Sequence, residues 1–178
     1  FKMKKIAITG ADGFIGSFVV KKLQNQNVKL KFFDINKYNL LESDSLKNFI
    51  KNQDVIIHLA GVNRGTNEEL FKVNTLGMLS LLDALAKYSP KTRIIFTSTF
   101  QVYLQGSFYG TSKKFAEELL SQYALNHQIQ SIILRLSNVY GPGGKPFYNS
   151  VIATFAHLIK NKKLAGIWIL YAISGIRK

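Results

Sequence analysis

The stretch Thr9-Gly10-Ala11-Asp12-Gly13-Phe14-Ile15-Gly16 decides the fold of this chain. It follows an apolar run that starts at Lys4 and it opens a pattern of helical spacing. Gly10 permits a tight turn, Gly13 has no side chain to block a pyrophosphate, and Gly16 lets the helix pack closely on the strand. Glycines at this spacing are weak evidence alone. With a strand before them and a helix after them, they predict a turn that binds a dinucleotide phosphate at a helix N-terminus.

Outward from this turn, short apolar runs alternate with longer stretches of helical periodicity. The expected strands are residues 4–9, 28–34, 54–58, 93–98 and 131–136. The expected helices are residues 14–24, 43–51, 67–87, 109–126 and 151–160. Near-continuous apolar strands between amphipathic helices predict an α/β fold, a doubly wound parallel sheet covered on both faces. Such folds bind ligands at the carboxyl ends of their strands.

Composition excludes several classes of protein. A chain of 178 residues is long enough for one domain and too short for two of ordinary size. It has no cysteine and only three scattered histidines, so we expect no disulfide scaffold, thiolate catalyst or metal site. The start does not resemble a signal peptide, and the apolar residues 164–176 are shorter than the roughly 20 needed to cross a bilayer. We therefore expect a cytoplasmic protein without membrane contact.

The formal net charge of +14 raises the possibility of a nucleic-acid partner. The positive residues, however, are mostly lysines spread along the chain, and they are not clustered with aromatic residues. A basic surface suits anionic substrates such as nucleotide sugars equally well. We therefore expect no nucleic-acid partner.

An acidic residue stands where a dinucleotide site needs one. Asp34 ends the second expected strand, roughly 20 residues after the glycine turn, where a carboxylate can accept both ribose hydroxyls. It would repel a 2′-phosphate, which favours NAD over NADP, although Lys37 is near enough to weaken that preference. The alternative is an ordinary turn or cap residue.

A possible proton-transfer group follows the fourth expected strand. Tyr109 and Lys113 are four residues apart, so they share one face of a helix, and Thr99 ends the preceding strand. A tyrosine with a pKa near 10 must lose about three units, roughly 4 kcal/mol, to act as a base at neutral pH. A neighbouring ammonium and a cationic nicotinamide both favour the phenolate, and Thr99 could hydrogen-bond the substrate oxygen. The alternative is an amphipathic tyrosine beside a solvated lysine.

Six segments together resemble the extended short-chain dehydrogenase/reductases, in particular the NAD-dependent epimerase/dehydratase family of nucleotide-sugar enzymes. The segments are ITGADGFIGS (8–17), DVIIHLAG (54–61), VNTLGMLSLLDAL (73–85), IIFTSTFQVY (94–103), YGTSK (109–113) and LRLSNVYGPG (134–143). They occur in the family's order and the resemblance extends from residue 4 to about residue 163. It implies a Rossmann-like NAD-binding domain.

The resemblance implies roles for individual residues. Tyr109 would be the catalytic acid/base, Lys113 its partner and a cofactor ligand, and Thr99 the third catalytic residue. The other implied cofactor contacts, beyond the three glycines and Asp34, are Phe14, Ile15, Leu59, Ala60 and Asn74. Besides Thr99, Asn63 and Asn138 would face the substrate.

The chain also departs from the family's pattern. Phe1 is not an initiator methionine, and the substrate domain that supplies much of the sugar-nucleotide pocket is expected to be largely missing. We expect the NAD-binding domain over residues 3–163, followed by an atypical apolar tail, 164–178, that has no assignment.

Several functions fit these features. The leading expectation is an NAD-dependent epimerase of a UDP-linked sugar that acts through a 4-keto intermediate. Segments 60–64 and 145–155 resemble surface-polysaccharide enzymes, so a 4-keto reductase with the same trio is the alternative. A 4,6-dehydratase is disfavoured because Phe100 and Gln101 follow Thr99, where the resemblance implies an acid. A catalytically inactive cofactor- or RNA-binding fragment, or a non-functional gene fragment, is the remaining alternative. By resemblance, we expect a homodimer through helices 67–87 and 109–126.

Overall fold

The computed structural model describes residues 3–148 and 150–161. The chain divides into two compact units, Phe1–Ser137 and Asn138–Lys178. The predicted end of the domain at residue 163 and the tail 164–178 lie outside the described residues.

The first unit contains one five-stranded parallel sheet in the order β2-β1-β3-β4-β5. The strands are β1 (Lys4–Thr9), β2 (Val28–Phe32), β3 (Val55–His58), β4 (Arg93–Thr99) and β5 (Ser131–Leu136). β2 lies on one side of β1, and β3, β4 and β5 follow on the other side. The connections that leave β1 and β3 therefore diverge at the carboxyl ends of these two strands. In open α/β sheets this reversal of strand order is where ligands bind.

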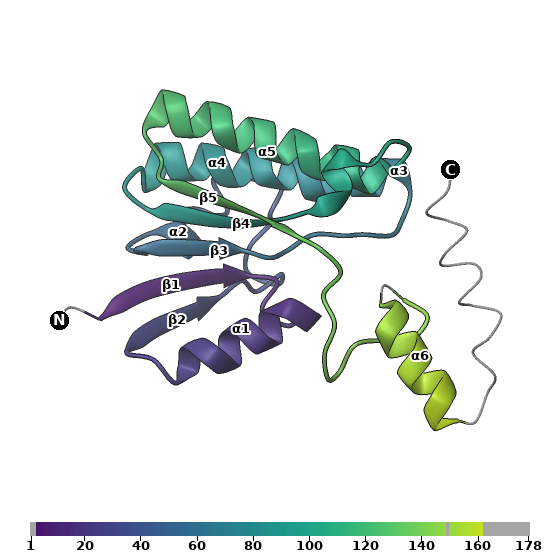
Figure 1. The fold of residues 1–178 in the computed structure, drawn as a ribbon. Coiled ribbons are helices and arrows are strands. Elements are labelled where there is room, and N and C mark those ends of the chain that lie inside the picture. Colours follow the sequence, from purple (N-terminus) through teal and green to yellow (C-terminus); the bar gives the residue numbers. More distant parts are fainter. Residues whose placement is uncertain (1–2, 149, 162–178) are drawn as a thin grey trace. The chain divides into compact units, whose positions relative to one another are not determined.

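Helices connect the strands. The elements of the first unit are α1 (Phe14–Gln24), α2 (Lys47–Ile50), α3 (Asn67–Phe71), the π-helix η1 (Lys72–Leu76), α4 (Gly77–Tyr88), the 3₁₀ helix η2 (Phe100–Tyr103) and α5 (Phe108–His127). Helix α1 lies on one side of the sheet, and α4 and α5 lie on the other (Figure 1). The predicted α/β fold with a doubly wound parallel sheet is thus confirmed.

The core lies between the sheet and α4 and α5. Ile56, Ile94 and Phe96 point to this side and are fully buried, as are Leu82 and Leu85 of α4. The alternate residues Val55, Ile57 and Ile95 face the other side and are only partly buried. The second unit contributes one described helix, α6 (Val151–Lys160), whose N-cap Ser150 accepts a hydrogen bond from the Ala153 N–H.

Three predicted elements differ from the observed ones. The helix expected over 67–87 is interrupted by η1, and the one expected over 43–51 is reduced to α2. The second strand ends at Phe32 because the Asp34 side chain and carbonyl accept hydrogen bonds from the N–H groups of the following turn. Local hydrogen bonds of this kind compete with strand pairing. Asp34 therefore lies in a turn just beyond the strand end.

No helix within the described ranges is long and apolar enough to cross a membrane.

Candidate active site

The glycine turn is packed so closely that it excludes side chains. Gly10 has a φ of +71°, and a Cβ atom there would lie 2.7 Å from the Ala60 nitrogen at the end of β3. A Cβ atom on Gly16 would lie 2.0 Å from the Gly10 carbonyl oxygen. The turn therefore brings β1, the end of β3 and the first turn of α1 into direct backbone contact.

The N-terminus of α1 is open to an anion. Its N-cap is Gly13, no side chain caps it, and its first turn contains no acidic residue. Phe14 and Ile15 form that first turn. A Cβ atom on Gly13 would meet only the Gly10 carbonyl, at 3.2 Å. Because free backbone N–H groups and the helix dipole both favour negative charge, these residues fit a dinucleotide pyrophosphate.

Thr9 holds the ends of β1 and β3 together. Its hydroxyl lies 2.8 Å from His58 Nδ1 and accepts a hydrogen bond from the Ala60 N–H, while its carbonyl accepts one from the Leu59 N–H. Burial, and secondarily the charge of Lys113, lower the pKa of His58 to about 3, so the ring is neutral. Leu59 and Ala60 thus have a fixed backbone at the edge of the sheet where the glycine turn lies.

Asp34 is already engaged in an ion pair. Its carboxylate accepts a hydrogen bond from the Asn36 N–H and lies 3.2 Å from the Lys37 ammonium. These two interactions lower the pKa of Asp34. The carboxylate can accept ribose hydroxyls, but the lysine beside it also offers a charge to a 2′-phosphate.

Asn74 links three segments. Its side chain accepts a hydrogen bond from the Val62 N–H and donates hydrogen bonds to the Val62 carbonyl and the Ser112 hydroxyl. The π-helix provides this placement, and π-helical turns are frequent at functional sites. The loop after β3, which contains the half-buried Asn63, is therefore tied to α5.

The start of α5 packs on the turn that follows Thr99. Ser107 caps α5 by accepting a hydrogen bond from the Gly110 N–H, and its hydroxyl donates to the Gln101 side chain. A Cβ atom on Gly110 would lie 2.2 Å from the Gln101 carbonyl oxygen. This packing brings the helical turn that carries Tyr109 close to the end of β4, where Thr99 is buried.

Lys113 is an unusually buried cation. Only 4% of the residue is exposed, and its ammonium lies over the Phe96 ring, 4.3 Å from the ring centroid. Burial lowers its pKa from 10.5 to about 7, while Glu117 opposes the shift. Burial also raises the pKa of Tyr109. The protein environment alone therefore favours the neutral forms of both groups.

Sequence reasoning missed a charged pair behind Lys113. Glu117 is 4% exposed, and the Arg135 guanidinium of β5 donates to both of its carboxylate oxygens. Two signals were available: an acid four residues after Lys113 on the same helical face, and one arginine within the apolar run Ser131–Leu136.

Asn138 belongs to the second unit, which is described separately from the sheet. Its expected substrate contact stays a prediction.

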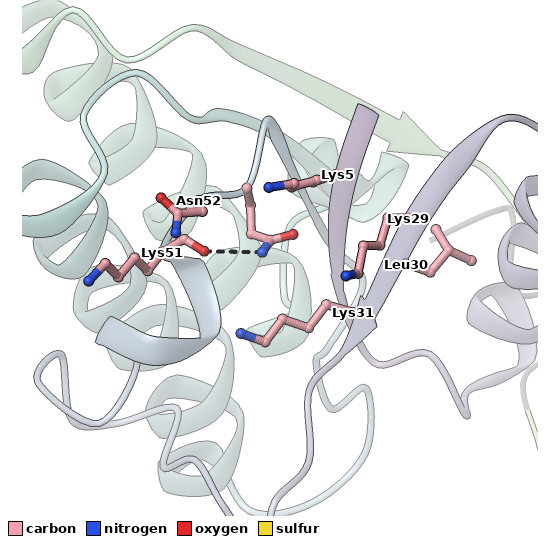
Figure 2. Close-up of a pocket in the computed structure, with 7 residues that line it drawn as sticks. Lys5, Lys29, Leu30, Lys31, Lys51 and Asn52 are labelled. Atoms are coloured by element: carbon pink, nitrogen blue, oxygen red, sulfur yellow. Dashed lines mark hydrogen bonds between the residues drawn. The ribbon is translucent and has the colours of Figure 1, made fainter. Parts of the chain in front are cut away.

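A cavity of about 340 Å³ lies away from this site. Figure 2 shows Lys5, Lys29 and Lys31 extending from β1 and β2 toward it, while Lys51 points away. Lysines on an edge strand such as β2 discourage pairing with other chains, and Lys31 also donates to the Asn48 carbonyl in α2.

Comparison with known proteins places the chain in a family. Residues 6–175 match the NAD dependent epimerase/dehydratase family. The chain is 33% identical over 156 residues to the UDP-2-acetamido-2,6-beta-L-arabino-hexul-4-ose reductase of Pseudomonas aeruginosa, covering 87% of this chain and 41% of the relative. It is 33% identical over 168 residues to the uncharacterized UDP-glucose epimerase YtcB of Bacillus subtilis, covering 82% of this chain and 52% of the relative.

The fold is also similar to that of solved structures. RMD from Pseudomonas aeruginosa, in a complex with NADPH, superposes with a TM-score of 0.76 at 27% identity, over 88% of this chain and 59% of that one. The chain spans about half the length of the relatives it matches.

Proposed function

The chain belongs to the NAD dependent epimerase/dehydratase family, and on that premise we propose that it binds NAD and epimerises a UDP-linked sugar. The observation that carries this proposal is the buried Lys113, four residues after Tyr109 on one helix that packs against the turn following Thr99. In the part of the chain that the structure describes, no salt bridge to Lys113 is found, and such burial is the environment expected of a group with a chemical task.

The cofactor would lie along the carboxyl ends of β1, β2 and β3. The uncapped first turn of α1, formed by Gly13, Phe14, Ile15 and Gly16, would hold the pyrophosphate. Asp34 would hold the adenosine ribose, and Leu59, Ala60 and Asn74 would border the groove. The open face at Gly13 supports this assignment because nothing but the Gly10 carbonyl approaches it.

The catalytic step would transfer a proton to and from the sugar hydroxyl at C4. Tyr109 would take that proton as the 4-keto sugar forms and return it when the alcohol is restored. Lys113 would stabilise the phenolate by its charge, and Thr99 and Asn63 would hold the sugar. When bound, the nicotinamide supplies the hydride chemistry, and the protein supplies position and charge.

A 4-keto reductase is the second candidate. It needs the same three residues but releases the alcohol after one transfer, and the Pseudomonas aeruginosa relative bears the name of a hexul-4-ose reductase. The ion pair between Asp34 and Lys37 leaves a positive charge beside the ribose site, which would also tolerate NADPH. Consumption of reduced cofactor with a 4-keto sugar, in contrast to interconversion of two sugars without net consumption, separates the two.

The proposed partner is a second copy of the chain. Leu76 of η1 and Phe115 of α5 are large apolar side chains that are 40% and 52% exposed, and η1 and α5 are neighbouring elements. A homodimer through the α4 and α5 face would cover them.

Titration of the purified chain with NADH, NADPH and a UDP-sugar by calorimetry tests the proposal. We expect NADH to bind and Gly13→Glu to abolish binding, because the new carboxylate would occupy and repel the pyrophosphate site. Gln26→Glu, an exposed change of equal charge beyond the far end of α1, is the matched control and should bind normally. A folded chain that binds neither NADH nor NADPH would contradict the proposal.

A further inference from the structure

Burial disfavours the positive charge on Lys113 that the proposed function requires. Lys113 is almost completely buried and Tyr109 is half-buried, and this burial raises the pKa of Tyr109 and lowers that of Lys113. A phenolate stabilised by an ammonium, as the proposed function requires, is therefore disfavoured unless another charge supports the ammonium.

Glu117 is placed to supply that charge. It lies one helical turn after Lys113 on α5, the side chains at this spacing share one face, and both residues are 4% exposed. In a site so poorly hydrated, a carboxylate acts on a neighbouring cation much more strongly than it would at the surface.

Arg135 keeps Glu117 ionised. Its Nε donates to Glu117 Oε1 at 3.0 Å and its Nη2 donates to Oε2 at 2.6 Å, which is a two-point contact from β5. Burial favours the neutral acid, but the hydrogen bonds to the carboxylate and the charges of Arg135 and Lys113 together outweigh it and lower the pKa of Glu117. Tyr103 in turn holds Arg135, whose guanidinium carbon lies 4.9 Å from the centre of the Tyr103 ring.

We propose that Glu117 is a positioning residue that keeps the buried Lys113 ammonium charged, with Arg135 anchoring the carboxylate. The arrangement of Glu117, Arg135 and Lys113 is independent of the proposed function, whereas the effect of Glu117 on catalysis rests on that function. Around Lys113 in the described part of the chain, the titratable groups are His58 of β3, Tyr109 and Glu117 of α5, and Arg135 behind Glu117. His58 is neutral, so Glu117 supplies the negative charge.

The direct test follows the titration of Lys113 itself. Lysine side-chain resonances of the full chain are recorded by NMR as a function of pH, and Lys113 is assigned by its loss in Lys113→Met. Glu117→Gln should lower the Lys113 midpoint by about one unit or more, a tenfold loss of proton affinity. Glu118→Gln removes the same charge from the neighbouring exposed position and should leave the midpoint unchanged.

A second readout separates a charge effect from loss of structure. NADH affinity of Glu117→Gln should fall at pH 7, where wild-type Lys113 is still partly protonated, and recover toward the wild-type value at pH 5, where Lys113 is protonated in both proteins, whereas a structural defect would weaken binding equally at both pH values. Glu117→Asp, which keeps the charge, should restore most of the affinity at pH 7. If Glu117→Gln does not fold, the double variant Glu117→Gln with Arg135→Met, which removes both charges of this ion pair, replaces it in the same measurements.

The outcomes distinguish this inference from the proposed function. An unchanged Lys113 midpoint in the variant, or an equal shift in Glu118→Gln, would overturn the role of Glu117 even if NADH binds. A lowered midpoint in a chain that binds no NADH would instead contradict the proposed function and leave the electrostatic role of Glu117 standing.

Discussion

The glycine turn and the start of helix α5 both lie at the carboxyl ends of the strands, but different interactions hold them there. At the turn, backbone atoms approach so closely that a Cβ on Gly16 would lie 2.0 Å from the Gly10 carbonyl oxygen. On α5, the site is made of side chains, with Lys113 and Glu117 almost completely buried. One region is shaped by steric exclusion and the other by charge.

This difference predicts different sensitivities. A steric site responds to added volume and is indifferent to pH, because its backbone groups do not titrate. A site of buried charges responds to pH and to isosteric changes of charge, because a buried ion without its partner is strongly disfavoured. Substitutions in the two regions should therefore be distinguishable by their pH dependence.

The largest effect is expected at Gly10. Gly10→Ala must accept a left-handed backbone and also place its Cβ 2.7 Å from the Ala60 nitrogen. We expect it to lower the free energy of unfolding by about 3 kcal/mol or more, equally at pH 6 and pH 9, as measured by urea denaturation.

Gly106 provides the matched control. Its φ of +76° is close to the +71° of Gly10, but a Cβ atom there would meet nothing within 4 Å. Gly106→Ala should therefore cost only the strain of the left-handed conformation, about 1 kcal/mol. Equal losses in the two variants would mean that contact with Ala60 does not matter, and the steric description of the turn would be wrong.

The next effect is expected at Lys113, with a size that depends on pH. Its pKa is about 7 in the folded chain and 10.5 when exposed, so between these values the unfolded chain binds more protons. The free energy of unfolding contributed by this group therefore rises with pH from 7 toward 10.5 and is constant below 7. Lys113→Met removes the buried charge, and we expect it to stabilise the chain by about 2 kcal/mol at pH 7 and by much less at pH 10.

Denaturation of wild type and Lys113→Met at both pH values measures this difference, because other titrating groups cancel between the two proteins. A stability gain accompanied by loss of NADH binding is expected of a residue that is kept for function at the expense of stability. A variant less stable than wild type at pH 7 would contradict the electrostatic description of α5.

Features that depend on nearby residues could be predicted from the sequence. The glycine turn, the parallel sheet and the helix that carries Tyr109 and Lys113 follow from local spacing and apolar periodicity, and the structure contains them. Their roles in catalysis and cofactor binding stay predictions.

Features that depend on contacts between residues far apart in the chain could not be predicted from the sequence. The apolar spacing over 67–87 is continuous, so nothing local indicates the π-helix, which forms where Asn74 bonds Val62, 12 residues earlier, and Ser112, 38 residues later. Glu117 resembles any surface acid until β5 brings Arg135, 18 residues away, against it. The sequence predicts which residues are polar, but tertiary contacts decide which of them pair and which, like Glu117, become buried.

The smallest effect on stability is expected from loss of the N-terminal cap of α5. Ser107→Ala removes the cap of α5 and the hydrogen bond to Gln101, so we expect a loss of about 1 kcal/mol in the free energy of unfolding. Ser121→Ala, on the exposed side of the same helix, removes only a bond to the Glu117 carbonyl and should be nearly neutral. Because the cap is uncharged, its loss should be the same at pH 6 and pH 9. A loss as large as that of Gly10→Ala would instead show that the tight packing of Gly110 on Gln101 depends on the cap, and that the start of α5 is a steric site like the glycine turn.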